Sequence, residues 1–154
     1  MQPHPLPEQP LDAASYAAGR FIDPASASLG KGWLIQKPDW MANAKQWRER
    51  FREAPLLTST TAGSELTLSF DGRAIGAYLL AGPDAGGLEY TIDDQPAAQI
   101  DVHHTFSRGL HYPRTVMFSA DLKPGPHRLK LRVTQPADRT GSGSSIRILQ
   151  FVAN

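Results

Sequence analysis

The clearest structural signal in this chain lies in residues 66–94, which read LTLSFDGRAIGAYLLAGPDAGGLEYTIDD. In Leu66–Phe70 apolar and polar residues alternate with a period of two, which predicts a half-buried β-strand. Asp71-Gly72 is a strong turn signal, and the more continuously apolar run Ile75–Leu80 is typical of a buried central strand. After a Gly/Pro/Asp loop, the alternation returns in Leu88–Ile92.

The same rhythm continues toward the C-terminus. Strand-like runs follow, separated by turn signals such as Lys123–Pro126, and they cover residues 100–106, 114–120, 129–133 and 145–152. About seven strands after Leu56, spaced by roughly 8–12 residues, are typical of an antiparallel sandwich. No strand–helix–strand rhythm is present, which argues against a parallel sheet.

The N-terminal third is less regular. Residues Met1–Pro10 contain four prolines and predict either a disordered tail or a linker from an upstream domain. Short edge strands are expected around Tyr16–Ile22 and Gly32–Gln36, and Asp39–Glu53 has apolar residues at helical spacing. The expected fold is therefore all-β: a two-sheet antiparallel β-sandwich, or jelly roll, over residues 11–154, with one short N-terminal helix.

Composition narrows the class of protein. The 154 residues suit one domain. Sixteen Lys and Arg residues against fifteen Asp and Glu residues leave the chain almost neutral, which argues against a nucleic-acid or a membrane-surface partner. The chain contains no cysteine, so disulfides and thiolate metal sites are excluded. Neither a membrane-spanning run nor a signal peptide is visible, so the chain is either cytoplasmic or part of a longer secreted or periplasmic parent.

Several short runs together resemble the β-sandwich domain appended to bacterial hydrolases of the SGNH (GDSL-type) family. The most specific run is Gly109-Leu110-His111-Tyr112-Pro113-Arg114-Thr115, and the likeness extends over about residues 11–154. The other runs that carry it are Leu66–Phe70, Gly82–Gly86, Glu89–Asp93, Asp121–His127 and Arg147–Val152.

This resemblance implies a jelly-roll accessory domain, usually C-terminal to an esterase domain that acts on acylated carbohydrate. It would make Met1–Pro10 the end of an interdomain linker and an SGNH catalytic domain the upstream partner. The family's Gly-Asp-Ser motif and its later Gly and Asn blocks, which supply the nucleophile and oxyanion donors, have no counterpart in these residues. The sequence therefore favours a non-catalytic chain without a cofactor, secreted or periplasmic as part of a longer protein.

Two histidine patterns suggest an acid–base pair and a metal site, but the expected strand geometry suits neither. Asp101 and His104 match the Asp-x-x-His spacing of the family's acid and base, yet the expected strand over residues 100–106 would point them to opposite faces. Likewise, His103 and His104 are adjacent on that strand, so they cannot chelate one metal ion as a pair. We therefore expect neither catalytic nor metal-binding residues here, and an autonomous Ser/His/Asp esterase is the least favoured reading.

A ligand site, in contrast, is expected in the loops that lie at one end of the sandwich. Aromatic and imidazole rings offer a face for sugar C–H groups, and an Arg guanidinium offers paired donors for hydroxyls or carboxylates. The candidate ligand-binding residues are Trp33, Asp84, His103, His104, Arg108, His111, Tyr112 and Arg114.

Structural roles compete with binding for several of these residues. Asp84 has the sequence context of a turn cap, and Arg114 could hold its loop by pairing with Asp84 or Glu89. Two functions stay open on the sequence: a carbohydrate-binding module of an SGNH-type esterase, or a docking domain that stabilises its esterase partner.

Overall fold

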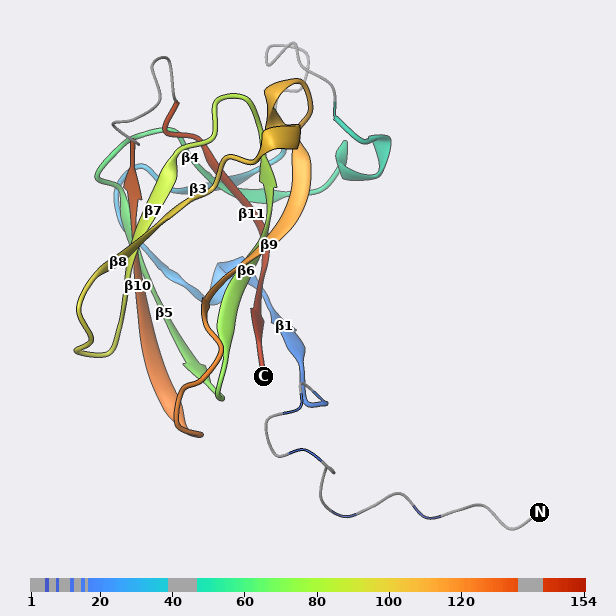
Figure 1. The fold of residues 1–154 in the computed structure, drawn as a ribbon. Coiled ribbons are helices and arrows are strands. Elements are labelled where there is room, and N and C mark those ends of the chain that lie inside the picture. The colour runs from blue at the N-terminus through green and yellow to red at the C-terminus, as the bar shows by residue number, and fades with distance from the viewer. Residues whose placement is uncertain are drawn as a thin grey trace.

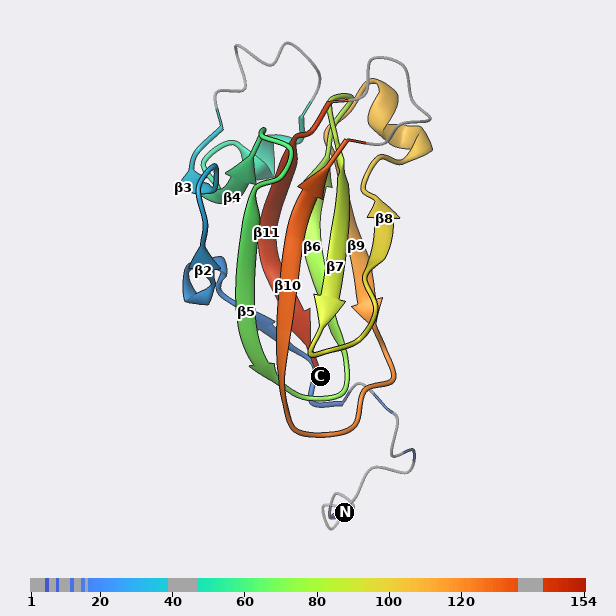
Figure 2. The ribbon, with the colours of Figure 1, turned by 90° about the vertical axis from the view of Figure 1, so that its left-hand side faces the viewer.

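Eleven β-strands form in the part of the chain that the computed structural model describes: residues 17–38, 47–135 and 143–154, with Pro5, Glu8, Asp12 and Ser15. The strands make two antiparallel sheets that pack face to face (Figures 1 and 2). The prediction of an all-β, two-sheet sandwich is therefore confirmed.

Strands β4, β6, β9 and β11 belong to one sheet, and β5, β7 and β10 to the other, so the chain repeatedly crosses between the sheets. The first sheet has the order β3 (Leu34–Gln36), β4 (Leu56–Ser59), β11 (Ile146–Ala153), β6 (Ile75–Ala81), β9 (Tyr112–Ser119), with β1 (Arg20–Ile22) also paired to β11. The second has the order β2 (Ser28–Leu29), β5 (Glu65–Asp71), β10 (Pro126–Thr134), β7 (Gly87–Ile92), β8 (Ala98–Asp101).

The core lies between the two sheets and follows the alternation of the sequence. In β5 the buried residues are Leu66, Leu68 and Phe70, while the residues between them are more exposed. β10 pairs with β5 in a register that places Leu129 opposite Leu68, so both strands turn their apolar side chains to the same face. Because a shift by one residue would expose that whole set, this register is strongly specified.

A second apolar cluster covers part of the outer face of the first sheet. Phe51, Leu56 and Leu80 are buried in it, and Trp47 packs against them. Most of the helix predicted over 39–53 falls on residues 39–46, which lie outside the described residues. In the described part Arg48 is extended, and only the 3₁₀ turn η2 (Glu49–Phe51) forms, which places Phe51 in the cluster.

The turns at the lower end of the sandwich in Figure 1 are joined by His127, at the start of β10. Its Nδ1 lies 2.7 Å from Asp93 Oδ2 in the β7–β8 turn, and its Nε2 lies 2.7 Å from the Lys123 carbonyl oxygen in the β9–β10 loop. Both oxygens can only accept, so both bonds form together only when both ring nitrogens carry hydrogen. This arrangement, the His127 latch, also includes the Arg128 N–H, which donates to Asp93 Oδ1 at 2.9 Å.

The His127 latch should make stability depend on pH. The hydrogen bond to Asp93 is the main cause that raises the pKa of His127 above its ordinary 6.5. Its contribution is thus fully present below pH 6.5 and is lost as pH rises through the higher folded value. Urea unfolding between about pH 5 and about pH 9 should show this loss in the wild type and not in His127→Gln. Parallel pH profiles for the two proteins would contradict it.

In the described ranges, no helix is long and apolar enough to cross a membrane. The short helical elements there are 3₁₀ turns: η1 (Pro24–Ser26), η2 and η3 (Thr105–Arg108). η3 lies at the upper end of the sandwich in Figure 1, next to the start of β9, and it leads to the candidate site.

Candidate functional site

An aromatic cluster forms at the upper end of the sandwich from residues that the sequence placed in one strand and one loop. The rings of His104 and Tyr112 are stacked, with centroids 5.3 Å apart and planes 15° apart. The Phe106 ring lies 5.2 Å from His104 and 5.4 Å from Tyr112. The Phe106 residue is 63% exposed, so this ring cluster presents an aromatic side chain to solvent.

Local hydrogen bonds explain why Phe106 is held outward. β8 ends at Asp101, where the Asp101 carboxylate accepts from the His103 N–H at 2.9 Å. His104 then caps η3: its Nδ1 accepts from the Phe106 N–H, and Ser107 Oγ accepts from the His104 N–H. Such side-chain bonds compete with strand pairing. The predicted strand over residues 100–106 is therefore wrong beyond Asp101.

Asp101 and His104, the pair with the family's acid–base spacing, both cap backbone N–H groups in this arrangement. Within the described residues, no three His, Asp or Glu side chains are placed to hold a metal ion.

Arg114 fixes the ring cluster to the opposite sheet. β9 and β8 are edge strands of different sheets, and the Arg114 guanidinium donates to the carbonyl oxygens of Val102 and His103, both at 3.2 Å. The structure thus gives Arg114 backbone partners in place of the expected Asp84 or Glu89. Its role in the described contacts is to hold the segment after β8 against β9.

Asp84 pairs with a residue that the sequence analysis missed. Arg147 Nη1 and Nη2 lie 2.9 and 2.6 Å from the two carboxylate oxygens of Asp84, the paired geometry that guanidinium and carboxylate groups favour. The Arg147 side chain is only 6% exposed and that of Asp84 39%. Burial raises the pKa of Asp84, but the bonds and charge of Arg147, with a bond from Ser145, outweigh it and lower the pKa to about 2.

His111 lies behind this ion pair. It is 1% exposed, and its Nε2 is 3.9 Å from Asp84 Oδ1. A Cβ on Gly82 would come within 2.5 Å of the His111 ring and 2.7 Å of Asp84 Oδ1, so only glycine leaves room for this packing. The sequence indicated His111 as a ligand-binding ring, but the structure buries it next to Asp84, so its ring offers no exposed face.

The remaining candidates divide between surface and core. Arg108 is exposed at the end of η3, and His103 is half-buried two residues before η3 begins. Trp33 is 4% exposed and belongs to the main core, so it offers no ring face to a sugar. The structure thus brings seven of the eight candidates to one end of the sandwich. They form two groups, one around the ring cluster and one made of Asp84 and His111. The pairing of Ala81 with Tyr112 connects the two groups.

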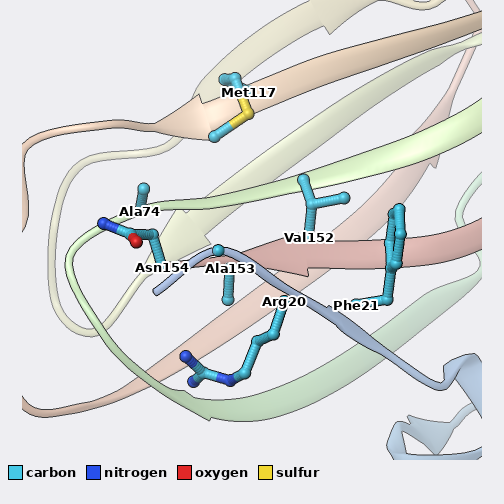
Figure 3. Close-up of a pocket in the computed structure, with 8 residues that line it drawn as sticks. Arg20, Phe21, Ala74, Met117, Val152, Ala153 and Asn154 are labelled. Carbon is cyan, nitrogen blue, oxygen red and sulfur yellow. The ribbon is translucent and has the colours of Figure 1, made fainter. Parts of the chain in front are cut away.

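A separate apolar groove of about 440 Å³ lies on the outer face of the first sheet (Figure 3). Phe21 from β1, Met117 from β9 and Val152 from β11 surround it, and Phe21 is 69% exposed. Gly76 lets the Met117 and Val152 side chains approach each other beside the groove, since a Cβ there would meet the Met117 sulfur at 2.6 Å and Val152 Cγ2 at 3.1 Å. The lining is mainly apolar, which suits a protein surface better than a sugar.

No protein-family pattern and no curated protein matches the chain. Solved structures do resemble it. A two-domain esterase active on acetylated mannans has a TM-score of 0.67 at 14% identity, over 97% of this chain. This chain spans 39% of that esterase.

Two further structures share the fold. A family two carbohydrate esterase from Cellvibrio japonicus has a TM-score of 0.57 at 12% identity, covering 88% of this chain and 32% of its own. The CBM36-1 domain of a multidomain xylanase from the hindgut metagenome of Trinervitermes trinervoides has a TM-score of 0.51 at 10% identity. The match covers 87% of this chain and 94% of the CBM36-1 chain. The chain therefore has a β-sandwich fold that also occurs in carbohydrate esterases and in a carbohydrate-binding module.

Proposed function

We propose that this chain is a non-catalytic carbohydrate-binding module of an SGNH-type carbohydrate esterase. The observation that carries the proposal is the exposed Phe106 ring, held on His104 and Tyr112 at the loop end of the sandwich. An exposed large aromatic side chain with locked neighbours is a preorganised surface for the C–H face of a sugar. The shared fold with esterases and a binding module supports the same function.

The polar groups around the ring cluster suit a glycan, and an acylated one in particular. Arg108 and His103 lie next to it in the chain and supply donors for hydroxyl or ester carbonyl oxygens. Asp84, with its carboxylate partly exposed and fixed by Arg147, supplies an acceptor. In this proposal the upstream partner is an SGNH catalytic domain, and the whole protein is secreted or periplasmic.

Replacing Phe106 by alanine should weaken glycan binding about tenfold or more, since burying a Phe ring is worth about 1.5–3 kcal/mol. Isothermal titration with acetylated and unacetylated manno-, xylo- and cello-oligosaccharides measures this. The matched control is Phe21→Ala, which removes a similarly exposed ring from the groove on the first sheet and should leave the glycan affinity unchanged. Binding of no glycan by the folded wild type, or equal losses in both variants, would refute the proposal.

A docking role for the same domain is the second candidate, and the apolar groove favours it. Ser15 and the C-terminal residue Asn154 meet beside the groove: Asn154, in its lining, donates through Nδ2 to the Ser15 carbonyl oxygen at 3.2 Å. In a longer protein, a domain that precedes Ser15 or follows Asn154 would connect to this chain on the side of exposed Phe21 and Met117. The occupant we propose is the esterase domain of the parent protein.

Docking can be tested in a protein that joins this chain to an SGNH esterase domain. Met117→Asp should lower the Tm of the esterase domain, because it places a charge in the apolar contact. Phe106→Asp at the opposite end is the control and should leave that Tm unchanged. If neither substitution changes the Tm of the esterase domain, the result would count against docking at the groove.

A further inference from the structure

An amphipathic cleft of about 600 Å³ opens at the end of the sandwich opposite the ring cluster, between the β7–β8 turn and the β9–β10 loop. Its lining comes from the last residues of β7 and β9 and from the two connections that follow these strands. Ile92 and Phe118 are buried in its floor, Tyr90 is half-buried there, and the exposed groups around them are polar. No residue of this cleft belongs to the ring cluster or to the Asp84–Arg147 pair.

Strand lengths explain why the cleft is open. β8 starts at Ala98, opposite Tyr90, so the end of β7 beyond Tyr90 has no β8 neighbour. β9 in the facing sheet runs on to Ser119, and its inward ring, Phe118, lies 5.0 Å from the Tyr90 ring with planes 48° apart. At the upper end of this edge, Arg114 of β9 bonds to the segment that follows β8. No such bond joins the described parts of β7 and β9 at the lower end, where the Tyr90 and Phe118 rings lie beneath the opening.

The rim carries hydrogen-bonding groups of several kinds. The Asp121 side chain is 98% exposed, and Arg73 is its charged neighbour at 4.0 Å. Gln95 and Lys123 are exposed at the rim, so amide, ammonium and carboxylate groups surround the opening. Opposite charges at the rim give the cleft little net preference for an anion or a cation.

The two sides of the cleft are held at a fixed separation. The His127 latch binds Asp93 of the β7–β8 turn and the Lys123 carbonyl of the β9–β10 loop, and His127 itself lines the cleft. Its ring packs against Phe70 of β5, with centroids 5.4 Å apart. A ligand that enters therefore meets walls already in place, which lowers the entropy cost of binding.

We propose that this cleft is a second carbohydrate site, which binds a neutral sugar residue with its C–H face toward the half-buried ring of Tyr90, which packs on the buried Phe118. The hydroxyls of the sugar bond to Asp121, Gln95 and Lys123 at the rim. The rim offers hydrogen-bonding groups of both charges above an apolar floor, so a neutral ring with many hydroxyls fits it best. The proposal extends the carbohydrate function but rests on different residues, so the two sites can fail separately.

Amide chemical shifts of the ¹⁵N-labelled chain, followed while mannobiose, xylobiose and cellobiose are added to about 50 mM, test this site at the millimolar affinities of single-sugar contacts. We expect saturable shifts at Gln95, Asp121 and Lys123 with at least one disaccharide. The double variant Gln95→Ala/Asp121→Ala changes only exposed side chains. The affinity for the disaccharide, measured from the shifts at Lys123, should fall about tenfold in this variant. Phe106→Ala should leave them unchanged.

Three outcomes would overturn the second site. The first is that no disaccharide shifts the amides of the cleft. The second is that the shifts persist with unchanged affinity in the Gln95→Ala/Asp121→Ala variant while the rest of its spectrum matches the wild type. The third is that Phe106→Ala abolishes them, which would assign all binding to the ring cluster.

Discussion

Replacing Arg147 by alanine is expected to lower the free energy of unfolding by about 2–3 kcal/mol. Breaking a buried ion pair costs about 3–5 kcal/mol, because the remaining charge stays buried without its partner. Asp84 keeps 39% of its side chain in solvent, which places the expected loss toward or below the lower end of that range. Urea unfolding at pH 7 measures the difference, and the structure of the loop over residues 82–86 should loosen with it.

Arg132→Ala is the matched control for this prediction. Its side chain is 53% exposed, and its Nη1 lies 3.7 Å from Glu89 Oε1, a surface pair of the kind worth about 0–1 kcal/mol. Equal losses in the two variants would mean that the Asp84–Arg147 pair contributes no more than a surface contact.

Acid should reveal the same ion pair. Arg147 holds the pKa of Asp84 at about 2, below the ordinary 3.8, so the contribution is present above pH 3.8 and is lost as pH falls toward 2. In Arg147→Ala this part of the acid dependence should disappear.

Gly82→Ala is the second substitution with a large expected effect, a loss of about 1–3 kcal/mol from overpacking. The added methyl would lie 2.5 Å from the His111 ring and 2.7 Å from Asp84 Oδ1, closer than real Cβ contacts come. His111 is buried and cannot simply turn into solvent. We therefore expect the Asp84–Arg147 geometry to change as well, with the pKa of Asp84 rising toward its ordinary value.

Gly109→Ala provides the control within the same loops. No atom lies within 4 Å of a Cβ added there, and Gly109 has a φ of −129°, which alanine adopts readily. The substitution should leave stability within about 0.5 kcal/mol of the wild type, or raise it slightly, because alanine restricts the unfolded chain. Thermal unfolding of both variants decides the point: equal Tm values for Gly82→Ala and wild type would contradict the tight packing.

The two-layer fold could be predicted because its strands follow simple alternation. β5 and β10 each bury every second residue, so Leu66–Phe70 and Leu129–Val133 identified both their conformation and their inward face. The strand predicted over residues 100–106 was wrong beyond Asp101. The apolar and polar residues still alternate there, but the Asp101 and His104 side chains accept hydrogen bonds from backbone N–H groups, so the segment leaves the sheet. Local hydrogen bonds of this kind leave no periodic trace in a sequence.

The positions of the candidate site residues could be predicted in part. The sequence placed most of its candidate residues in loops that do lie together at one end of the sandwich. It treated Phe106 as one of a strand's alternating residues and gave no sign of Arg147, which lies within the apolar last strand. The spacing of His104 and Ser107 is the one local signal that could have indicated the η3 cap. Trp33 and His111 were overestimated, because burial depends on long-range packing that spacing does not show.

The most direct test of a glycan-binding ring cluster is the affinity of Phe106→Ala for the best-bound oligosaccharide, measured by calorimetry beside wild type and Phe21→Ala. The ring cluster predicts at least a tenfold loss in Phe106→Ala alone, with the Tm of all three proteins within a few degrees. An unchanged affinity in Phe106→Ala would contradict it, wherever else on the sandwich the glycan is bound.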